Sequence, residues 1–474
     1  KVLAAKIFGL LGYRGGYAKE NAIDPAKIDQ LLIFAHHPSK DHTLEFDNIR
    51  AGGSSRTPRW LTMSEDEFFP MIDRFGQFVH KDWIGKVESI DDFRRLKQQE
   101  AINLDRHPRP DSWNQYGGWK EGPQLQATGR FRVEKYLGKW GLVDPEGRLF
   151  WSHGIDCVRS TTGYTPITGR EFLFADLPAR ESPFAQFHGQ ATWAPHGFYQ
   201  GKSFATYNFS GANLLIKYGP DWRARFADLC HRRLQSWGMN TIGNWSDSSI
   251  YLMRKTPYVA TLDAGKKPIE GSSGYWGKFP DVFDSDFRES LVKRLDAEKG
   301  KTSSDPWCVG YFVDNELAWG DEISLAVATL ASPPDQAAKK VFLIDLKAKY
   351  DTIAKLNASW GTEHRSWDEL MKATVPPDPQ QARDDLLAFS TKTAEQYFRT
   401  CAEAIEVVDP QMLYLGCRFA WANDLAIRAA AKYCDVLSFN RYQPSVADFR
   451  LPNGMDKPMI IGEFHFGALD RGMF

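Results

Sequence analysis

The sequence predicts an α/β protein whose main part is a (β/α)8 barrel, and two observations lead to that fold class. Apolar β-runs alternate along the chain with segments of helical periodicity, which is the pattern of parallel strands joined by helices. Each β-run is continuously apolar and then ends on polar side chains. In a barrel, helices cover the outer face of every strand and the site lies at the carboxyl ends of the strands, so this fold explains both features.

Seven parallel strands are expected in chain order. The fourth, WCVGYFVDNE at residues 307–316, shows the pattern most clearly, because it runs apolar up to Val313 and then delivers an acid, an amide and a second acid. The other six apolar runs occupy residues 148–158, 239–246, 258–263, 412–420, 435–442 and 458–466.

Helices are expected between these strands. Pro220 opens a helix and Gly238 ends it, and the apolar side chains between them recur at a spacing near 3.6. Residues 287–295 carry a second apolar face, and two longer periodic segments lie near 335–357 and 382–407.

The first 130 residues differ from the rest. Residues 28–38 and 42–52 predict two antiparallel strands joined by a turn-rich segment, and residues 54–130 are rich in Pro, Arg, Asp and Gln. We therefore expect a partial β-sandwich at 1–53, a linker at 54–130 and the barrel at 131–474. The eighth strand is expected to be lacking, since the sequence ends eleven residues after Glu463.

Charge and composition limit the kinds of partner that this protein is expected to bind. The 59 basic and 60 acidic residues nearly cancel, which argues against nucleic acid, and no apolar run is long enough to span a membrane. The six cysteines are widely spaced, so buried free thiols are expected rather than disulfides or a metal site. No glycine-rich phosphate loop follows a strand, which argues against a dehydrogenase or a nucleotide-binding protein. No cofactor and no metal at the site are expected, and the need for a structural ion is left open. The oligomeric state is left open.

Glu316 and Glu463 are the candidate catalytic pair. They end the fourth and seventh predicted strands, which face each other across the mouth of a barrel. Hydrolysis of a glycosidic bond with retention needs two carboxyl groups about 5 to 5.5 Å apart, one as acid/base and one as nucleophile. The alternative interpretation is that both carboxylates simply form salt bridges with nearby Lys or Arg.

The motifs around this pair resemble those of a known group of enzymes. Asn315-Glu316 after the fourth strand and Glu463 on the seventh resemble clan A of the glycoside hydrolases, which are retaining (β/α)8 enzymes. The segments WGMNTIGNW, VGYFVDNELAWG, YDTIAKLNASWGTEHRSWDEL and IIGEFHFGALDRGMF are most similar to family-50 β-agarases and more distantly to family-42 β-galactosidases. The resemblance covers residues 131–474, and the agarases also carry a carbohydrate-binding-module-like domain where the partial sandwich is expected.

The resemblance implies roles for single residues. Glu316 would be the acid/base, Glu463 the nucleophile, Asn315 a ligand of the sugar 2-hydroxyl and Tyr442 a hydrogen-bond partner of the nucleophile. Asn315 could instead cap a helix, and Tyr442 could be a rim aromatic. Weaker candidates for lining the substrate subsites, each with packing inside the fold as the alternative, are His153, Asn244, Trp193, Trp319 and Trp421.

The expected function is thus retaining hydrolysis of β-1,4-galactosidic bonds in agar-type galactans by a secreted or periplasmic enzyme. A β-galactosidase or a carrageenan-type galactan hydrolase is the alternative within the same class, and the near-zero net charge favours a neutral polymer. A non-catalytic carbohydrate-binding protein is the alternative of a different class.

Overall fold

The computed structural model describes residues 40–41, 43–47, 63–160, 164–194, 196–264, 267–443 and 445–465. The chain forms two compact units. The first comprises Lys1–Lys97 with Thr161–Pro220, and the second comprises Gln98–Ser160 with Asp221–Phe474. Each unit is described by itself.

The first unit has a small antiparallel sheet in the order β5-β7-β6. Its strands are β5 (Thr165–Pro166), β6 (His188–Ala191) and β7 (Phe204–Tyr207). Asn208 then caps helix α3 (Phe209–Tyr218) by accepting a hydrogen bond from the Gly211 N–H. The remaining helical segments of this part are α1 (Glu65–Phe68), η3 (Glu171–Leu173), η4 (Ala185–Phe187) and the beginning of α2 (Ile90–Arg106). The segment that follows the first predicted strand therefore forms a small sheet of its own.

The second unit carries the parallel strands. A four-stranded parallel sheet has the order β10-β9-β8-β4, and β11 pairs in parallel with β12. Single parallel bridges, Tyr311 to Tyr414 and Phe419 to Phe439, place residues 414–419 between β10 and β11. The strands are β4 (Gly154–Ile155), β8 (Thr241–Ile242), β9 (Tyr258–Leu262), β10 (Cys308–Val313), β11 (Leu437–Asn440) and β12 (Met459–Glu463).

Seven parallel segments thus follow one another in chain order, as the sequence predicts, within an α/β fold. Two of them differ from expectation. The segment 148–158 is split, because Leu149–Phe150 (β3) pairs antiparallel with β2 (Lys139–Val143) and only Gly154–Ile155 joins the parallel sheet. The fifth segment forms only single bridges, since Gly416 and Arg418 have left-handed φ values of 82° and 53° that interrupt a regular strand. No pairing of β12 with β4 is present among the described residues, so they show no closed barrel.

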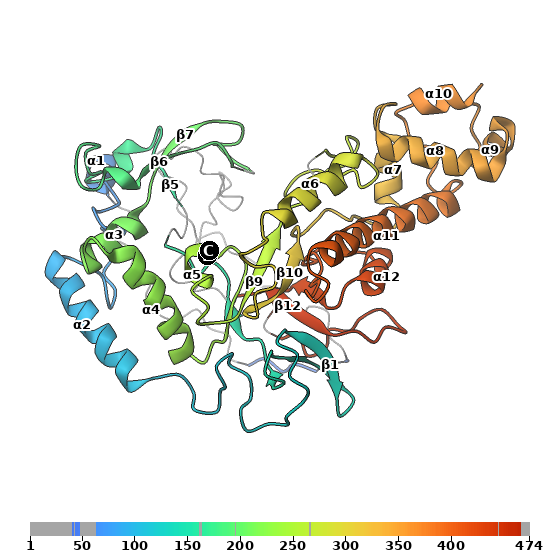
Figure 1. Ribbon diagram of the computed structural model, residues 1–474. Helices are drawn as coiled ribbons and strands as arrows, with labels where there is room; N and C mark the ends of the chain where they lie inside the picture. The colour runs from blue at the N-terminus through green and yellow to red at the C-terminus, as the bar shows by residue number, and fades with distance from the viewer. Residues whose placement is uncertain are drawn as a thin grey trace. The chain divides into compact units, whose positions relative to one another are not determined.

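Helices pack against this sheet largely where periodicity predicts them. Helix α6 begins after Asp284, which caps it, and buries Phe287, Leu291 and Leu295 on one face. Helix α11 is the longest and packs along α6, α7 and α12 (Figure 1). The helices of this unit after α2 are α4 (Trp222–Ser236), α5 (Ser248–Tyr251), α6 (Ser285–Asp296), α7 (Ser324–Leu330), α8 (Ala337–Tyr350), α9 (Ile353–Trp360), α10 (Trp367–Lys372), α11 (Arg383–Val408) and α12 (Asp424–Tyr433).

A second, smaller apolar cluster lies at the amino-terminal ends of the strands. Tyr116, Phe131 and Phe150 pack there against residues near the strand starts such as Val259 and Val309. Phe150 belongs to the antiparallel sheet β1 (Arg132–Tyr136), β2 (Lys139–Val143), β3 (Leu149–Phe150). That sheet covers the amino-terminal end and leaves the carboxyl-terminal ends for the polar residues.

The two antiparallel strands predicted at 28–38 and 42–52 lie outside the described residues, except for 43–47, which are exposed and form no strand. The predicted linker includes α1 and the whole of the 17-residue helix α2. The predicted domain limits stay a prediction.

Three further properties bear on function. None of the helices in the described ranges is long and apolar enough to cross a membrane. Five cysteines are buried, Cys157 is partly buried, and all six are free thiols. The described part of the chain holds no group of three His, Cys, Asp or Glu side chains that could bind a metal ion.

Candidate active site

Asn440 joins the two predicted catalytic carboxylates. Its side-chain Nδ2 lies at the end of β11 and donates to Glu316 Oε1 at 2.7 Å and to Glu463 Oε2 at 3.1 Å. The two oxygens share one nitrogen, so they are at most 5.8 Å apart, the sum of 2.7 and 3.1 Å. This limit applies to one oxygen of each carboxyl group, and it is compatible with the separation of about 5 to 5.5 Å between the carboxyl groups of retaining enzymes.

The backbone that carries these groups is held in an uncommon conformation. Asp314, Glu316 and Arg418 are not glycines, yet their φ values are 57°, 51° and 53°. Left-handed backbone costs such residues about 1 to 3 kcal/mol each, so surrounding contacts must hold it. The Asp314 N–H donates to the Leu262 carbonyl at 2.8 Å, and the Arg418 N–H donates to Ser438 Oγ at 2.9 Å. These contacts fix the direction in which the following side chains leave the strands.

Asp314 is itself a structural acid below the site. Its carboxylate accepts from the Ala264 N–H at 2.9 Å and from the Tyr397 hydroxyl at 2.8 Å. Burial raises the pKa of Asp314 to about 6, against the hydrogen bonds that lower it. It ties the end of β10 to the end of β9 and to helix α11.

Arg418 is the only cation among the described residues that forms an ion pair with Glu316 or Glu463, and it is fully buried. Its Nη2 donates to Glu463 Oε2 at 2.6 Å and to Asp156 Oδ2 at 2.9 Å, while its Nε donates to Asn440 Oδ1 at 3.3 Å. Burial raises the pKa of Asp156, and the neighbouring Arg418 guanidinium opposes that rise. Arg418 thus orients Glu463 and Asn440 together and is balanced by Asp156.

Aromatic side chains donate hydrogen bonds to both carboxylates. The Tyr442 hydroxyl donates to Glu463 Oε1, and burial together with that hydrogen bond raises the pKa of Tyr442. Trp276 Nε1 donates to Glu316 Oε2 at 2.7 Å. Tyr275 packs edge-on against Trp276 and lies 6.3 Å from Trp421 between ring centres. Trp276, Tyr275 and Trp421 are exposed and form an aromatic rim next to Glu316.

The structure brings together most of the predicted site residues of the second unit. Asn315 Oδ1 accepts from Asn440 Nδ2 at 3.3 Å, which places it beside Glu316. Asn244 is buried next to Asp156, whose carboxylate accepts its backbone N–H, and its side-chain amide has no hydrogen-bond partner in the described part of the chain. Trp421 belongs to the aromatic rim.

The position of Trp319 favours the packing alternative, and the binding roles of His153 and Trp193 stay predictions. Trp319 is 1% exposed and stacks on Phe398 with ring centres 5.4 Å apart, so its indole belongs to the core. His153 directly precedes β4 and lies at the amino-terminal end of the sheet, away from the carboxylates. Trp193 follows β6 in the first unit, where it is exposed, and its role in binding stays a prediction.

Sequence reasoning missed four residues of the site. Arg418 is the one charged residue of the predicted strand 412–420, and Asp156 lies near the end of the predicted strand 148–158, which is a signal because an unpaired buried charge is costly. Asn440 is the polar residue that ends the sixth predicted strand. Trp276 comes from a loop between β9 and α6, and nothing in its local pattern indicates that it contacts Glu316.

Comparison with known proteins finds similarity to β-agarases over nearly the whole chain. No protein-family model matches the chain. The chain is 32% identical over 495 residues to β-agarase B of Vibrio sp. (strain JT0107) and 31% identical over 511 residues to β-agarase A of the same organism. These alignments cover 96% and 97% of this chain but 51% and 49% of the relatives, so the chain spans about half the length of the curated relatives it matches.

Solved structures of agarases are also similar to this chain. An agarase, AgWH50C, has a TM-score of 0.75 at 33% identity, with 86% of this chain and 62% of that chain covered. An exo-β-agarase has a TM-score of 0.77 at 32% identity, with 86% of this chain and 63% of that chain covered. The chain is therefore a relative of the β-agarases, and the resemblance predicted from its motifs is confirmed.

Proposed function

We propose that this protein is a retaining glycoside hydrolase that cleaves β-1,4-galactosidic bonds in agar-type galactans, with its site at the mouth of a (β/α)8 barrel. The observation that carries the proposal is the shared contact of Glu316 and Glu463 with Asn440, which holds one oxygen of each carboxylate within 5.8 Å of the other. Retaining enzymes hold the two carboxyl groups about 5 to 5.5 Å apart. The homology to β-agarases supports the substrate class.

The contacts of the two acids support different roles. Glu463 accepts from the buried Arg418 guanidinium and from the Tyr442 hydroxyl, and a positive charge beside it suits a carboxylate that attacks the anomeric carbon. Glu316 accepts from the neutral donors Trp276 and Asn440. It donates its proton to the glycosidic oxygen as the bond to the anomeric carbon breaks.

In the second step the Glu316 carboxylate takes a proton from water, whose oxygen attacks the anomeric carbon and releases Glu463. While Glu463 is esterified it carries no charge. Asp156 then remains as the anionic partner of Arg418, so the guanidinium is not left unpaired in a buried position. The network is thus suited to both states of the nucleophile.

Substrate contacts are assigned to side chains around this pair. Asn315 binds the 2-hydroxyl of the sugar that reacts, and the unpartnered amide of Asn244 offers a further polar contact. The exposed rings of Trp276, Tyr275 and Trp421 lie on the Glu316 side and stack on the sugar of the leaving group. Since agar is a polymer that is degraded outside the cell, we also propose a secreted or periplasmic location.

The test is to incubate the protein with agarose, a carrageenan, porphyran and a nitrophenyl galactoside, and to identify products by mass. We expect agarose oligosaccharides whose newly formed reducing ends are β-anomers when first observed by NMR. Initial α-anomers would overturn retention. Release from the nitrophenyl galactoside alone, or from the carrageenan alone, would favour the alternative substrates. Binding without any product would favour a non-catalytic carbohydrate-binding protein.

A further inference from the structure

A tryptophan-lined groove lies in the second unit at the end of the sheet opposite to the catalytic pair. It encloses about 610 Å³ and is lined by the turn at 112–119, the hairpin β1–β2, the strand β3 with its following residues, and Asn240. His153 and Asn240 directly precede the parallel strands β4 and β8, whereas Glu463 ends β12. The ends of parallel strands point in opposite directions, so the groove is separate from the candidate active site.

Four indoles line this groove, and they differ in how much of each is exposed to solvent. Trp151 is 84% exposed and Trp119 is 53% exposed, while Trp140 is less exposed and Trp113 is partly buried. Exposed tryptophan is unusual on a surface because burying it is favourable. Indole faces stack well on the CH faces of pyranose rings, which makes such a cluster suitable for a sugar chain.

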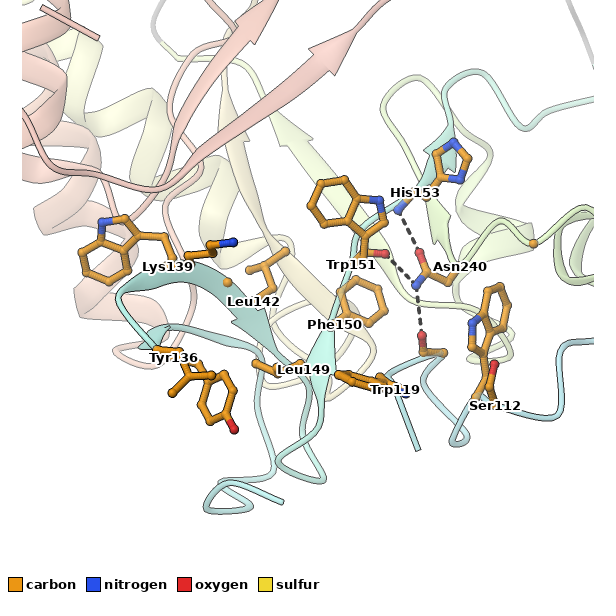
Figure 2. A pocket seen from close by; sticks show the side chains of 16 residues that line it. Ser112, Trp119, Tyr136, Lys139, Leu142, Leu149, Phe150, Trp151, His153 and Asn240 are labelled. Carbon is orange, nitrogen blue, oxygen red and sulfur yellow. Dashed lines mark hydrogen bonds between the residues drawn. The ribbon is translucent and has the colours of Figure 1, made fainter. Parts of the chain in front are cut away.

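The walls of the groove are held rigidly although the rings are exposed. The buried Asn240 side chain accepts from the His153 N–H at 2.9 Å and donates to the carbonyls of Trp151 at 2.9 Å and Gly117 at 3.1 Å (Figure 2). The Trp119 N–H donates to the Leu149 carbonyl at 2.8 Å. Three separate segments are thus fixed to one another, so a ligand would not have to order them on binding.

The side chains of two tryptophans are also held in place. Trp140 Nε1 donates to Asp456 Oδ1 at 2.7 Å, and Lys135 lies 5.0 Å from the centre of its ring. The ring of Trp119 lies over Gly122, where an added Cβ would come within 2.5 Å of it. Both rings are therefore already placed for contact before a ligand arrives.

The charge of the lining indicates which sugar chain fits. Lys139 and His153 are its ionisable groups with basic nitrogen, and no carboxylate side chain lines the groove among the described residues. A sulfated polymer usually meets several Arg and Lys side chains, whereas a neutral one needs ring faces and a few hydroxyl or amide groups. Ser112 supplies a hydroxyl group to the lining, and Lys139 is its one lysine.

We propose that this groove is a second, non-catalytic binding site for a neutral galactan chain, which keeps the protein on the polymer while the catalytic site cleaves it. The choice of galactan rests on the proposed function. The site itself rests on the indoles and their fixed positions.

The test compares Trp151→Ala, Trp151→Phe and the double variant Trp119→Ala/Trp151→Ala in a Glu463→Gln background, which leaves the gel uncut. Ile344→Ala is the control, because Ile344 is 63% exposed on α8 of the same unit and does not line the groove. Retention is measured by affinity electrophoresis in gels that contain agarose, a carrageenan or no polysaccharide.

We expect retention in agarose to weaken by about threefold for Trp151→Ala and about tenfold for the double variant, since each aromatic contact contributes a modest amount. Trp151→Phe keeps a flat ring and should retain most of the binding. With Glu463 intact, Trp151→Ala should cleave short soluble oligosaccharides at the rate of the parent.

Three results would overturn the proposal: retention equal to the control, weaker retention in carrageenan alone, or a lower melting temperature with unchanged retention, which would make the ring a packing surface. A change of sedimentation coefficient in Trp151→Ala would instead assign the groove to contact between copies of the chain. If the parent fails to cleave agarose but its retention depends on Trp151, the proposed function fails and the second site stands.

Discussion

The two ends of the parallel sheet in the second unit carry different kinds of side chain. At the carboxyl-terminal end, ionisable side chains contact one another directly, with Arg418 between Glu463 and Asp156 and with Asp314 below them. At the amino-terminal end, the neutral amide of Asn240 joins the walls of the groove and indoles provide the surface. The first arrangement suits moving a proton and forming a bond, and the second suits holding a chain without changing it.

This difference teaches where charge is needed. Buried charges are costly unless they are paired and hydrogen-bonded, and at the carboxyl-terminal end Arg418 is paired with both Glu463 and Asp156. The groove needs no charge, because stacking on a ring face depends on contact area and position. Changes at the carboxyl-terminal end should therefore alter rates and pH dependence, and changes in the groove should alter retention alone.

The largest effect is expected from Glu463→Gln and Glu316→Gln. Each removes a group that forms or donates a bond in the reaction, so turnover of agarose oligosaccharides should fall by at least about 10³-fold. Neither residue supports the core, and the melting temperature should stay near that of the parent. A variant that keeps turnover within a few fold of the parent would remove that residue from the mechanism. The carboxyl-terminal end of the sheet would then no longer differ from the groove by being catalytic.

Asp314→Asn should change how stability depends on pH. The pKa of Asp314 is about 6 in the folded protein, above the ordinary 3.8, so the folded state keeps this proton to higher pH than the unfolded state. Stability from this group is complete below pH 3.8 and falls as pH rises through about 6, by up to about 3 kcal/mol. Asparagine cannot ionise and avoids that loss.

The measurement is the melting temperature of Asp314→Asn minus that of the parent, from pH 4 to pH 7. The difference should grow toward neutral pH. Asp351→Asn, whose carboxyl group is 80% exposed, is the control for loss of one surface charge. A difference that stays constant over this range would show that the pKa of Asp314 is not raised in the folded protein.

Arg418→Lys should lower kcat by about 10²-fold with a smaller change in KM. Lysine keeps the charge but loses the planar fork, so it cannot reach Glu463, Asp156 and Asn440 together. Asp156→Asn should lower kcat in the same direction and change the pH profile of kcat, because the buried guanidinium loses its second anion. If both variants altered only thermal stability, Arg418 would be a packing residue and not one that positions the nucleophile.

The smallest effect is expected from Trp276→Phe, which keeps a ring but loses the Nε1–H donor to Glu316. Loss of one hydrogen bond should lower kcat/KM by about tenfold or less. Tyr275→Phe keeps the neighbouring ring and is the matched control. If Trp276→Phe equals the parent while Trp276→Ala is impaired, the ring acts by stacking alone, and the two ends of the sheet would use tryptophan in the same way.

Much of this molecule follows from local sequence. Continuous apolar runs that end on polar residues identify the strands and Glu316 and Glu463, because side-chain periodicity and burial are properties of the chain itself. The same reasoning finds the helices, as with α6, whose three buried side chains recur every four residues. It also predicts the relation to β-agarases from short motifs.

Tertiary structure alone decides which of these side chains meet. Asp156, Arg418, Asn440 and Glu463 come from four separate strand segments, and only the register of those segments places them within hydrogen-bond distance. Tryptophan shows the limit most clearly, since Trp319 is buried in the core, Trp276 contacts Glu316 and Trp151 is exposed at the far end of the sheet. An indole is apolar and also carries a donor, so its own chemistry permits all three positions, and the packing around each one selects between them.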